Sequence, residues 1–188
     1  MLTLVATLVI ATAPIIEAIT DADDAPGVRA VFDVEADADV VLDLLWDVGR
    51  FRKIFPDIQA LEVMGRPDVR TIDVRFVVDA VVAKPTYTLR RKLDVANRRV
   101  SWVNLSGDLK KIVGHWQVAA GGLGRCRVTY QTVVDVGIPG ASSIYRSIVM
   151  GKVEQVIERV RMAAIAAMPK QGAPRQVPAP TPAPTTTP

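Results

Sequence analysis

Hydrophobic and polar residues alternate with a period of two over much of the chain, and this pattern is typical of β-strands. It is clearest from Thr71 to Ala83, where Ile72, Val74 and Phe76 share one face and charged residues occupy the other. The same pattern predicts strands over residues 28–35, 58–64, 71–83, 87–95, 99–105, 110–119 and 125–136. We therefore expect a sheet of about six or seven strands.

The hydrophobic period changes to that of an α-helix in two places. After Asp37, which suits a helix N-cap, apolar residues recur at helical spacing as far as Val48. After Pro139 a long helix is predicted, with Lys152 among the polar positions on its outer side. Its apolar stripe contains Tyr145, Val149, Val153, Val156, Val160 and Ala164.

The order of these elements predicts an α+β fold, in which a curved antiparallel sheet wraps around the long C-terminal helix. Consecutive strands without helices between them favour antiparallel pairing over a parallel sheet. The space between such a sheet and its helix is a natural pocket for an apolar molecule.

The two ends of the chain are predicted to lie outside this domain, which we place at residues 27–168. Residues 1–26 form an apolar leader followed by an acidic linker, and residues 169–188 form a Pro/Thr-rich tail predicted to be disordered. The leader has two interpretations. As a signal peptide or membrane anchor it would place the protein in the periplasm or at a membrane, and as a leader without a special role it would leave the protein in the cytoplasm.

Charge and composition exclude several classes of function. The net charge is only +3, and no block of five or six like charges is present, so no nucleic-acid partner is expected. The single cysteine, Cys126, excludes an intramolecular disulfide and a cysteine-based metal cluster. The single histidine, His115, is predicted on the outer sheet face, away from any catalytic partner. We expect no metal, no cofactor and no catalytic residues.

Several short motifs occur in a characteristic order. They are Leu45-Trp46-Asp47-Val48 with Phe51 and Phe55-Pro56, Trp102 with Gly107, Gly114-x-Trp116, Val128-Thr129-Tyr130 and Ile138-Pro139. From Val28 to Ala167 the chain resembles the START-like (SRPBCC) superfamily of polyketide cyclases, dehydrases and lipid-transport proteins, and most of all its coenzyme Q-binding branch. The resemblance implies a helix-grip fold with a hydrophobic cavity, and it implies no invariant catalytic residues.

Strand parity identifies the side chains predicted to face the interior. The large inward candidates are Phe76, Tyr87, Trp102, Trp116, Tyr130 and Tyr145, accompanied by Val149 on the last helix. Each could form a cavity wall that contacts ligand or could simply pack in the core.

Arg91 shares the inward parity and is unusual there, because an unpaired buried charge is very costly. It needs a carboxylate, backbone carbonyls or a polar ligand group, unless a β-bulge turns it outward or it reaches water at the cavity mouth.

These observations predict a non-enzymatic binding protein for a hydrophobic small molecule, such as a lipid or an isoprenoid quinone. Two alternatives stay open: an enzyme of the cyclase or dehydrase type that uses the same cavity, and a START-like protein-interaction module. Phe51, Ile54 and Phe55, flanked by cations, are predicted to form a lip that makes peripheral membrane contact.

Overall fold

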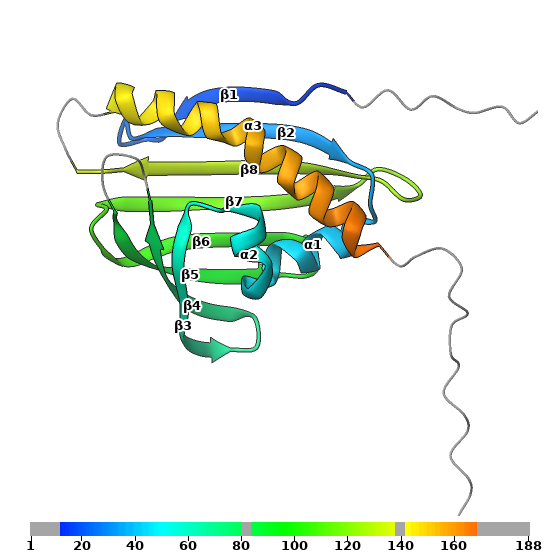
Figure 1. Cartoon of the computed structure of the whole chain (residues 1–188), viewed down its shortest axis with the longest axis horizontal. Coiled ribbons are helices and arrows are strands. Elements are labelled where there is room, and N and C mark those ends of the chain that lie inside the picture. Colours follow the sequence, from blue (N-terminus) through cyan, green and yellow to red (C-terminus); the bar gives the residue numbers. More distant parts are fainter. Residues whose placement is uncertain (1–11, 80–83, 138–141, 169–188) are drawn as a thin grey trace, which may run out of the picture.

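The alternating segments form one antiparallel sheet of eight strands within the described part of the chain (Figure 1). A computed structural model describes residues 12–79, 84–137 and 142–168, and the side chains of residues 142–149 lie outside that description. The sheet order is β1-β2-β8-β7-β6-β5-β4-β3. The strands are β1 (Ile15–Thr20), β2 (Pro26–Val34), β3 (Ile58–Asp68), β4 (Thr71–Val78), β5 (Thr86–Asp94), β6 (Arg99–Gly107), β7 (Lys111–Ala120) and β8 (Cys126–Asp135).

The described part of the chain contains three helices, and they lie against one face of this sheet (Figure 1). Helices α1 (Ala38–Trp46) and α2 (Val48–Ile54) connect β2 to β3, and the long helix α3 (Ser142–Ala167) follows β8. Helix α3 contacts β1, β2 and both shorter helices. This arrangement confirms the predicted α+β helix-grip fold, with one strand more than expected.

The additional strand is β1, which lies in the segment that we predicted to be a leader outside the domain. It pairs with β2 along its whole length, from Ile15 opposite Val31 to Thr20 opposite Pro26. The acidic residues after it form a tight turn, in which the Asp21 carboxylate accepts hydrogen bonds from two backbone amides and from Lys111 Nζ. The sheet therefore begins before residue 27.

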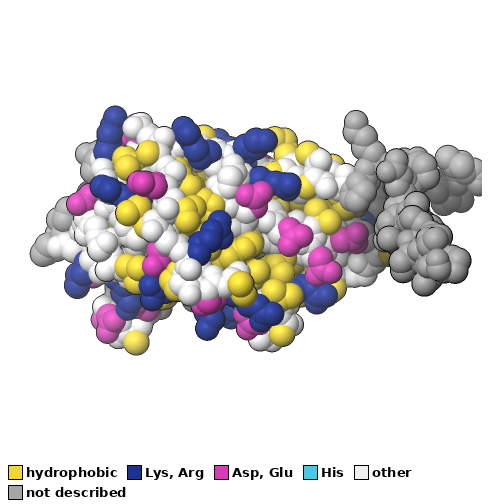
Figure 2. Space-filling model, turned by 90° about the horizontal axis from the view of Figure 1, so that it is seen from below, with side chains coloured by type: hydrophobic (Ala, Val, Ile, Leu, Met, Phe, Trp, Pro, Cys, Tyr) yellow, Lys and Arg dark blue, Asp and Glu magenta, His cyan; other side chains and the backbone are white. Residues whose placement is uncertain are grey.

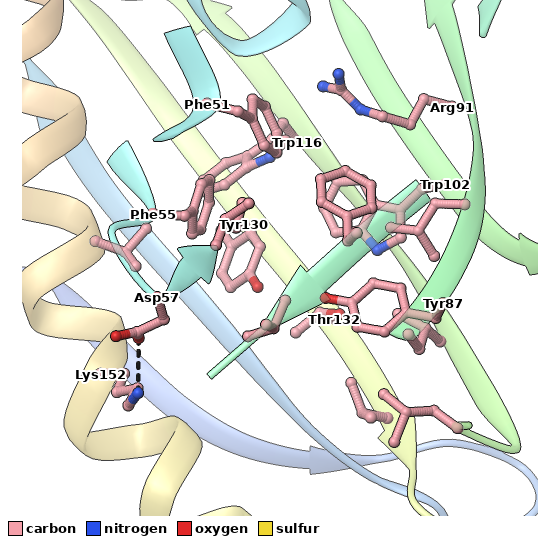
Figure 3. A pocket seen from close by; sticks show the side chains of 18 of the residues that line it. Phe51, Phe55, Asp57, Tyr87, Arg91, Trp102, Trp116, Tyr130, Thr132 and Lys152 are labelled. Carbon is pink, nitrogen blue, oxygen red and sulfur yellow. Dashed lines mark hydrogen bonds and ion pairs between the residues drawn. The ribbon is translucent and has the colours of Figure 1, made fainter. Parts of the chain in front are cut away.

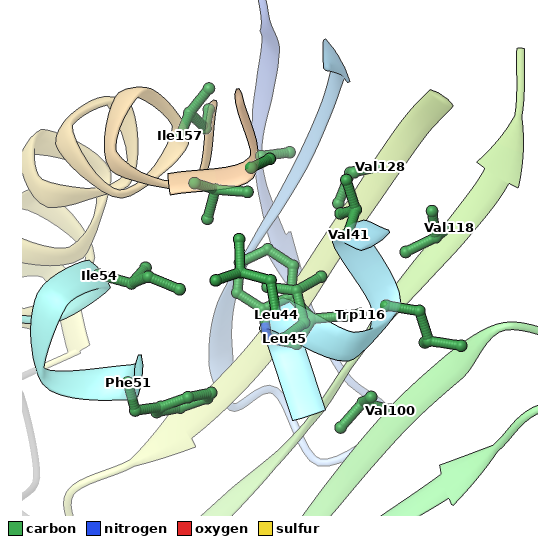
Figure 4. Close-up of a cluster of buried hydrophobic side chains, with 14 of the residues drawn as sticks. Val41, Leu44, Leu45, Phe51, Ile54, Val100, Trp116, Val118, Val128 and Ile157 are labelled. Carbon is green, nitrogen blue, oxygen red and sulfur yellow. The ribbon is translucent and has the colours of Figure 1, made fainter. Parts of the chain in front are cut away.

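The core lies between the helices and the sheet (Figure 4). Leu44 and Leu45 of α1 and Ile54 of α2 are almost fully buried, and they meet Trp116 and Val100 of the sheet. Burial of each such side chain contributes about 1.5–3 kcal/mol. Hydrophobic packing thus fixes α1 and α2 over the centre of the sheet.

Asp37 precedes α1 as predicted, but its side chain has a different role from the expected cap. No side-chain hydrogen bond joins it to the helix, and its carboxylate instead accepts one from the Gly124 amide at 3.1 Å. Gly122 and Gly124, in the hairpin between β7 and β8, have φ values of 113° and 67°, a backbone region that glycine adopts without strain. Asp37 therefore fastens the start of α1 to the hairpin.

The molecular surface carries charges of both signs. Figure 2 shows basic and acidic side chains interspersed over one face, with hydrophobic side chains between them. Within the described residues, no helix combines the length and the hydropathy needed to cross a membrane.

Gly151→Ala is expected to raise the free energy of unfolding by about 1 kcal/mol, because glycine disfavours a helix interior relative to alanine. Gly151 is exposed in α3, and a Cβ there would meet nothing within 4 Å. Chemical denaturation measures the change. The matched control is Gly27→Ala in β2, where a Cβ would lie 2.8 Å from Cγ2 of Val133 and should destabilise the fold. Equal stability changes in the two variants would contradict the expectation.

Candidate functional site

A cavity of about 230 Å³ lies between the sheet and helices α2 and α3 (Figure 3). Its wall draws on strands β3 to β8 and on both helices, so residues far apart in the sequence meet there. The lining residues are Phe51, Phe55, Asp57, Ile58, Phe76, Val78, Tyr87, Leu89, Arg91, Trp102, Leu109, Ile112, Trp116, Tyr130, Thr132, Val134, Lys152, Val153 and Val156.

One side of the cavity is a group of three aromatic rings from adjacent strands. The Trp116 and Tyr130 ring centroids lie 4.2 Å apart, and Trp102 lies 6.1 Å from Tyr130. The register explains the group, because Trp116 pairs with Tyr130 and Trp102 pairs with Gly114. A Cβ at Gly114 would lie 2.6 Å from Cζ2 of Trp102, so the indole needs a glycine beside it.

A second aromatic group comes from strands β4 and β5 and from α2. Phe76 of β4 stacks with Tyr87 of β5 at 5.7 Å between centroids, and Phe51 lies 6.3 Å from Phe76. Phe55 joins the two groups, since its ring lies 5.0 Å from Phe51 and 6.4 Å from Trp116. Aromatic pairs at such separations add to the energy of simple area burial.

Arg91 points inward, as its parity predicted, and is 1% exposed. Its guanidinium donates hydrogen bonds to the carbonyls of Leu45 and Trp46 at the end of α1. The rings of Phe51 and Trp46 lie over it, with centroids 4.3 and 5.4 Å from Cζ. Burial lowers the pKa of Arg91 to about 9, which leaves it charged at neutral pH. We expected a buried Arg91 to need a carboxylate, backbone carbonyls or a polar ligand group as its partner. The structure shows backbone carbonyls in this role.

Among the described lining residues, Tyr87, Tyr130 and Thr132 carry hydroxyl groups, and the Thr132 hydroxyl donates to the Val113 carbonyl. Figure 3 shows the hydroxyls of Tyr87 and Tyr130 directed toward the side where Thr132 lies. Burial raises the pKa of Tyr87 to about 12. Burial also raises the pKa of Tyr130, and hydrogen bonding with Thr132 offsets part of that rise. Both tyrosines therefore stay protonated over the whole physiological pH range.

Lys152 and Asp57 form an ion pair at the partly exposed edge of the cavity. Lys152 Nζ of α3 lies 2.6 Å from the Asp57 carboxylate, and both side chains are partly exposed (Figure 3). We expected Lys152 on the outer side of the helix; its side chain is partly exposed, but the ion pair with Asp57, just before β3, also places it at the cavity lining. Neither helical periodicity nor strand parity could identify a partner 95 positions away.

The structure gathers most of the predicted site residues around this one cavity. Those that line it are Phe76, Tyr87, Arg91, Trp102, Trp116 and Tyr130. Tyr145 and Val149 lie outside the residues whose side chains are described. Whether the lining residues contact a ligand stays a prediction.

Other expectations need correction. Phe51 and Ile54 were expected at an exposed lip, but they are 8% and 0% exposed because their side chains pack in the core, and Phe51 also lines the cavity wall. His115 needs no such correction, because it was predicted on the outer sheet face and does not line the cavity, although it is half-buried there. Sequence analysis also missed Thr132, although its parity matches that of Tyr130.

Among the described residues no cluster of His, Cys, Asp and Glu could hold a metal ion.

Comparison with known proteins agrees with this geometry. The family model for polyketide cyclase / dehydrase and lipid transport matches residues 34–161. No curated protein matches the chain.

Solved structures share the fold at low sequence identity. The ZhuI aromatase/cyclase from Streptomyces sp. R1128 is 22% identical, with a TM-score of 0.68 over 78% of this chain and 97% of its own. A START superfamily protein from Mycobacterium smegmatis is 13% identical, with a TM-score of 0.66 over 76% and 99%. The lipid transfer and protein localization domain of human StarD13 is 17% identical, with a TM-score of 0.63 over 81% and 85%.

Proposed function

Because the chain belongs to the polyketide cyclase / dehydrase and lipid transport family, we propose that it binds a hydrophobic small molecule in its cavity without transforming it. The observation that carries the proposal is the wall, which consists almost entirely of aromatic and aliphatic side chains. Binding comes mainly from burial of apolar surface, at about 25 cal/mol per Å², while a few polar groups fix orientation.

The charged groups of the wall favour binding over catalysis. General acid–base chemistry needs a group that can exchange a proton near neutral pH. Asp57 is the one carboxylate among the described lining residues, and Lys152 is already paired with it. Tyr87 and Tyr130 have raised pKa values, so their hydroxyls stay protonated and do not exchange a proton near neutral pH.

The ligand that we propose is a lipid or an isoprenoid quinone, as in the coenzyme Q-binding branch that the sequence resembles. Access from a membrane surface is part of this proposal. Arg50, Arg52 and Lys53 of α2 are exposed beside the half-buried Phe55, which lines the cavity. Co-sedimentation with anionic vesicles, measured against neutral vesicles, tests this peripheral contact.

Solvent extraction of the purified protein, followed by mass spectrometry, is expected to yield a co-purified apolar molecule in near-stoichiometric amount. Val156→Trp should reduce that amount several-fold, because Val156 of α3 lines the cavity and the larger ring would occupy it. Gln155→Trp is the matched control, since Gln155 is the exposed neighbour in the same helix. An extract without ligand, or equal amounts from both variants, would contradict the proposal.

The alternative function is an enzyme of the cyclase type that uses the same cavity. We consider it because the chain shares its fold with an aromatase/cyclase. Asp57 is the described residue that such chemistry would use as a base. Turnover of a bound compound that disappears in Asp57→Asn, with binding unchanged, would favour the enzyme over the binding protein.

A further inference from the structure

The face of the sheet away from the three described helices carries the single histidine of the chain (Figure 1). His115 of β7 lies opposite Ser101 of β6 and Gln131 of β8. Arg29 of β2 in turn lies opposite Gln131. Side chains directly opposite each other in antiparallel strands face the same side and lie about 5 Å apart. A row of polar side chains therefore crosses the middle of this outer face.

Positive charge gathers beside this row. Arg99 of β6 and Lys92 of β5 lie on the same face as His115, on the neighbouring strands. In the part of the chain that the structure describes, neither of these cations forms an ion pair. Asp94 lies opposite Arg99, but its carboxylate accepts hydrogen bonds from the backbone amide and the side chain of Asn97. The positive charge of Arg99 is thus left without a close counter-ion among the described residues.

The imidazole of His115 lies in a positive electrostatic environment. Burial, together with the charges of Arg99 and Arg29, lowers the pKa of His115 below its usual value, and no carboxylate offsets this effect. Arg29 has a partner, since its guanidinium lies 3.3 Å from the Glu17 carboxylate. Both of these side chains are exposed, and such a surface pair is weak. An anion beside the imidazole would balance the charges that now repel its protonated form.

We propose that His115, with Arg99 and Arg29, binds an oxyanion, such as a phosphate or sulfate group, on this outer face. The fork of N–H donors on an arginine matches the oxygens of such a group. Ser101 and Gln131 beside the imidazole provide a hydroxyl and an amide that can donate further hydrogen bonds. The site is separate from the cavity, because the sheet lies between them and none of these five residues lines the cavity.

Proton NMR of the untagged full-length protein tests the proposal, because the single histidine gives one imidazole C2 resonance. Sulfate is the probe, since it keeps its charge while the imidazole titrates. We expect the pKa of His115 to be higher by about one pH unit in sodium sulfate than in sodium chloride of equal ionic strength. Matching the ionic strength removes the effect of screening. By linkage, sulfate should bind several-fold more tightly at about pH 5 than at about pH 8.

Removal of single guanidinium groups locates the site. Arg99→Gln should abolish most of the difference between the two salts and weaken sulfate binding several-fold in isothermal titration calorimetry. Arg29→Gln is a second variant, with a smaller expected effect because Glu17 already pairs with Arg29. Arg90→Gln is the matched control, since Arg90 shares the outer face but lies 2.8 Å from the Asp73 carboxylate, and it should leave both measurements unchanged. Thermal denaturation confirms that each variant folds.

A phosphate group can reach this site as a free ion or as the headgroup of a lipid. Co-sedimentation with phosphatidate vesicles distinguishes these sources. Weaker co-sedimentation of Arg99→Gln than of Arg90→Gln supports a lipid headgroup, and equal co-sedimentation together with the sulfate response supports a soluble anion.

The result that overturns the inference is the same pKa of His115 in the two salts. An equal response of Arg99→Gln and Arg90→Gln to sulfate also overturns it. Neither result bears on the cavity, which the extraction experiment tests separately.

Discussion

Replacement of Arg91 by methionine is expected to lower the free energy of unfolding by about 3 kcal/mol. The change leaves the Leu45 and Trp46 carbonyls without their guanidinium donor in a buried site, and each unsatisfied buried group costs about 1–3 kcal/mol. Methionine still fills space, which limits the loss from packing. Urea denaturation, followed by circular dichroism, measures the change.

Arg90→Met is the matched control, because the neighbouring arginine points to the outer face of the same strand. Its guanidinium lies 2.8 Å from the Asp73 carboxylate, and 45% of its side chain is exposed. Ion pairs of this kind contribute at most about 1 kcal/mol. If both variants lost a comparable amount of unfolding free energy, the hydrogen bonds from Arg91 of β5 to the end of α1 would not be important for stability.

The second large effect is expected at Gly114, where alanine should destabilise the protein by about 3 kcal/mol and displace Trp102. The added Cβ would lie 2.6 Å from Cζ2 of Trp102 and would also contact the Gln131 carbonyl oxygen. Backbone cannot move aside in the middle of the sheet, so the indole must shift into the cavity. Denaturation measures the loss of stability, and tryptophan fluorescence reports the shift.

Gly65→Ala serves as its control. Gly65 lies in β3 at the edge of the sheet, and a Cβ there would meet nothing within 4 Å. The change should alter the free energy of unfolding by less than about 0.5 kcal/mol. A variant at Gly114 that is as stable as wild type, with unchanged ligand retention, would contradict the close approach of Trp102 to that glycine.

Strand parity predicted the inner wall well, because its evidence is local. In a strand every second residue faces the same side, so Trp116 and Tyr130 could be assigned to the interior without knowledge of their partners. Arg91 followed from the same rule, although only the structure shows that the end of α1 supplies its acceptors.

The features that sequence analysis missed depend on partners distant in the chain or on segments without a clear pattern. Residues 15–20 belong to a largely apolar stretch that Glu17 interrupts without setting up an alternating pattern, so β1 was taken as part of the leader. Phe51 was assigned to an exposed lip because cations flank it, yet the short helix α2 turns its ring toward Phe76. Lys152 depends on Asp57, which the helical pattern does not contain.

Strand β1 also affects how readily the protein associates with other copies of itself. It covers the outer edge of β2, a nine-residue strand that is mostly apolar and buried. At the other end of the sheet, β3 is irregular, with register shifts between Ile58 and Asp68 and with Pro67 near its end. A chain shortened to residue 27 would leave the N–H and C=O groups along β2 unpaired. Such an edge can recruit a strand from another molecule, so we expect the shortened chain to aggregate more readily than the chain whose sheet ends in the short, largely exposed β1.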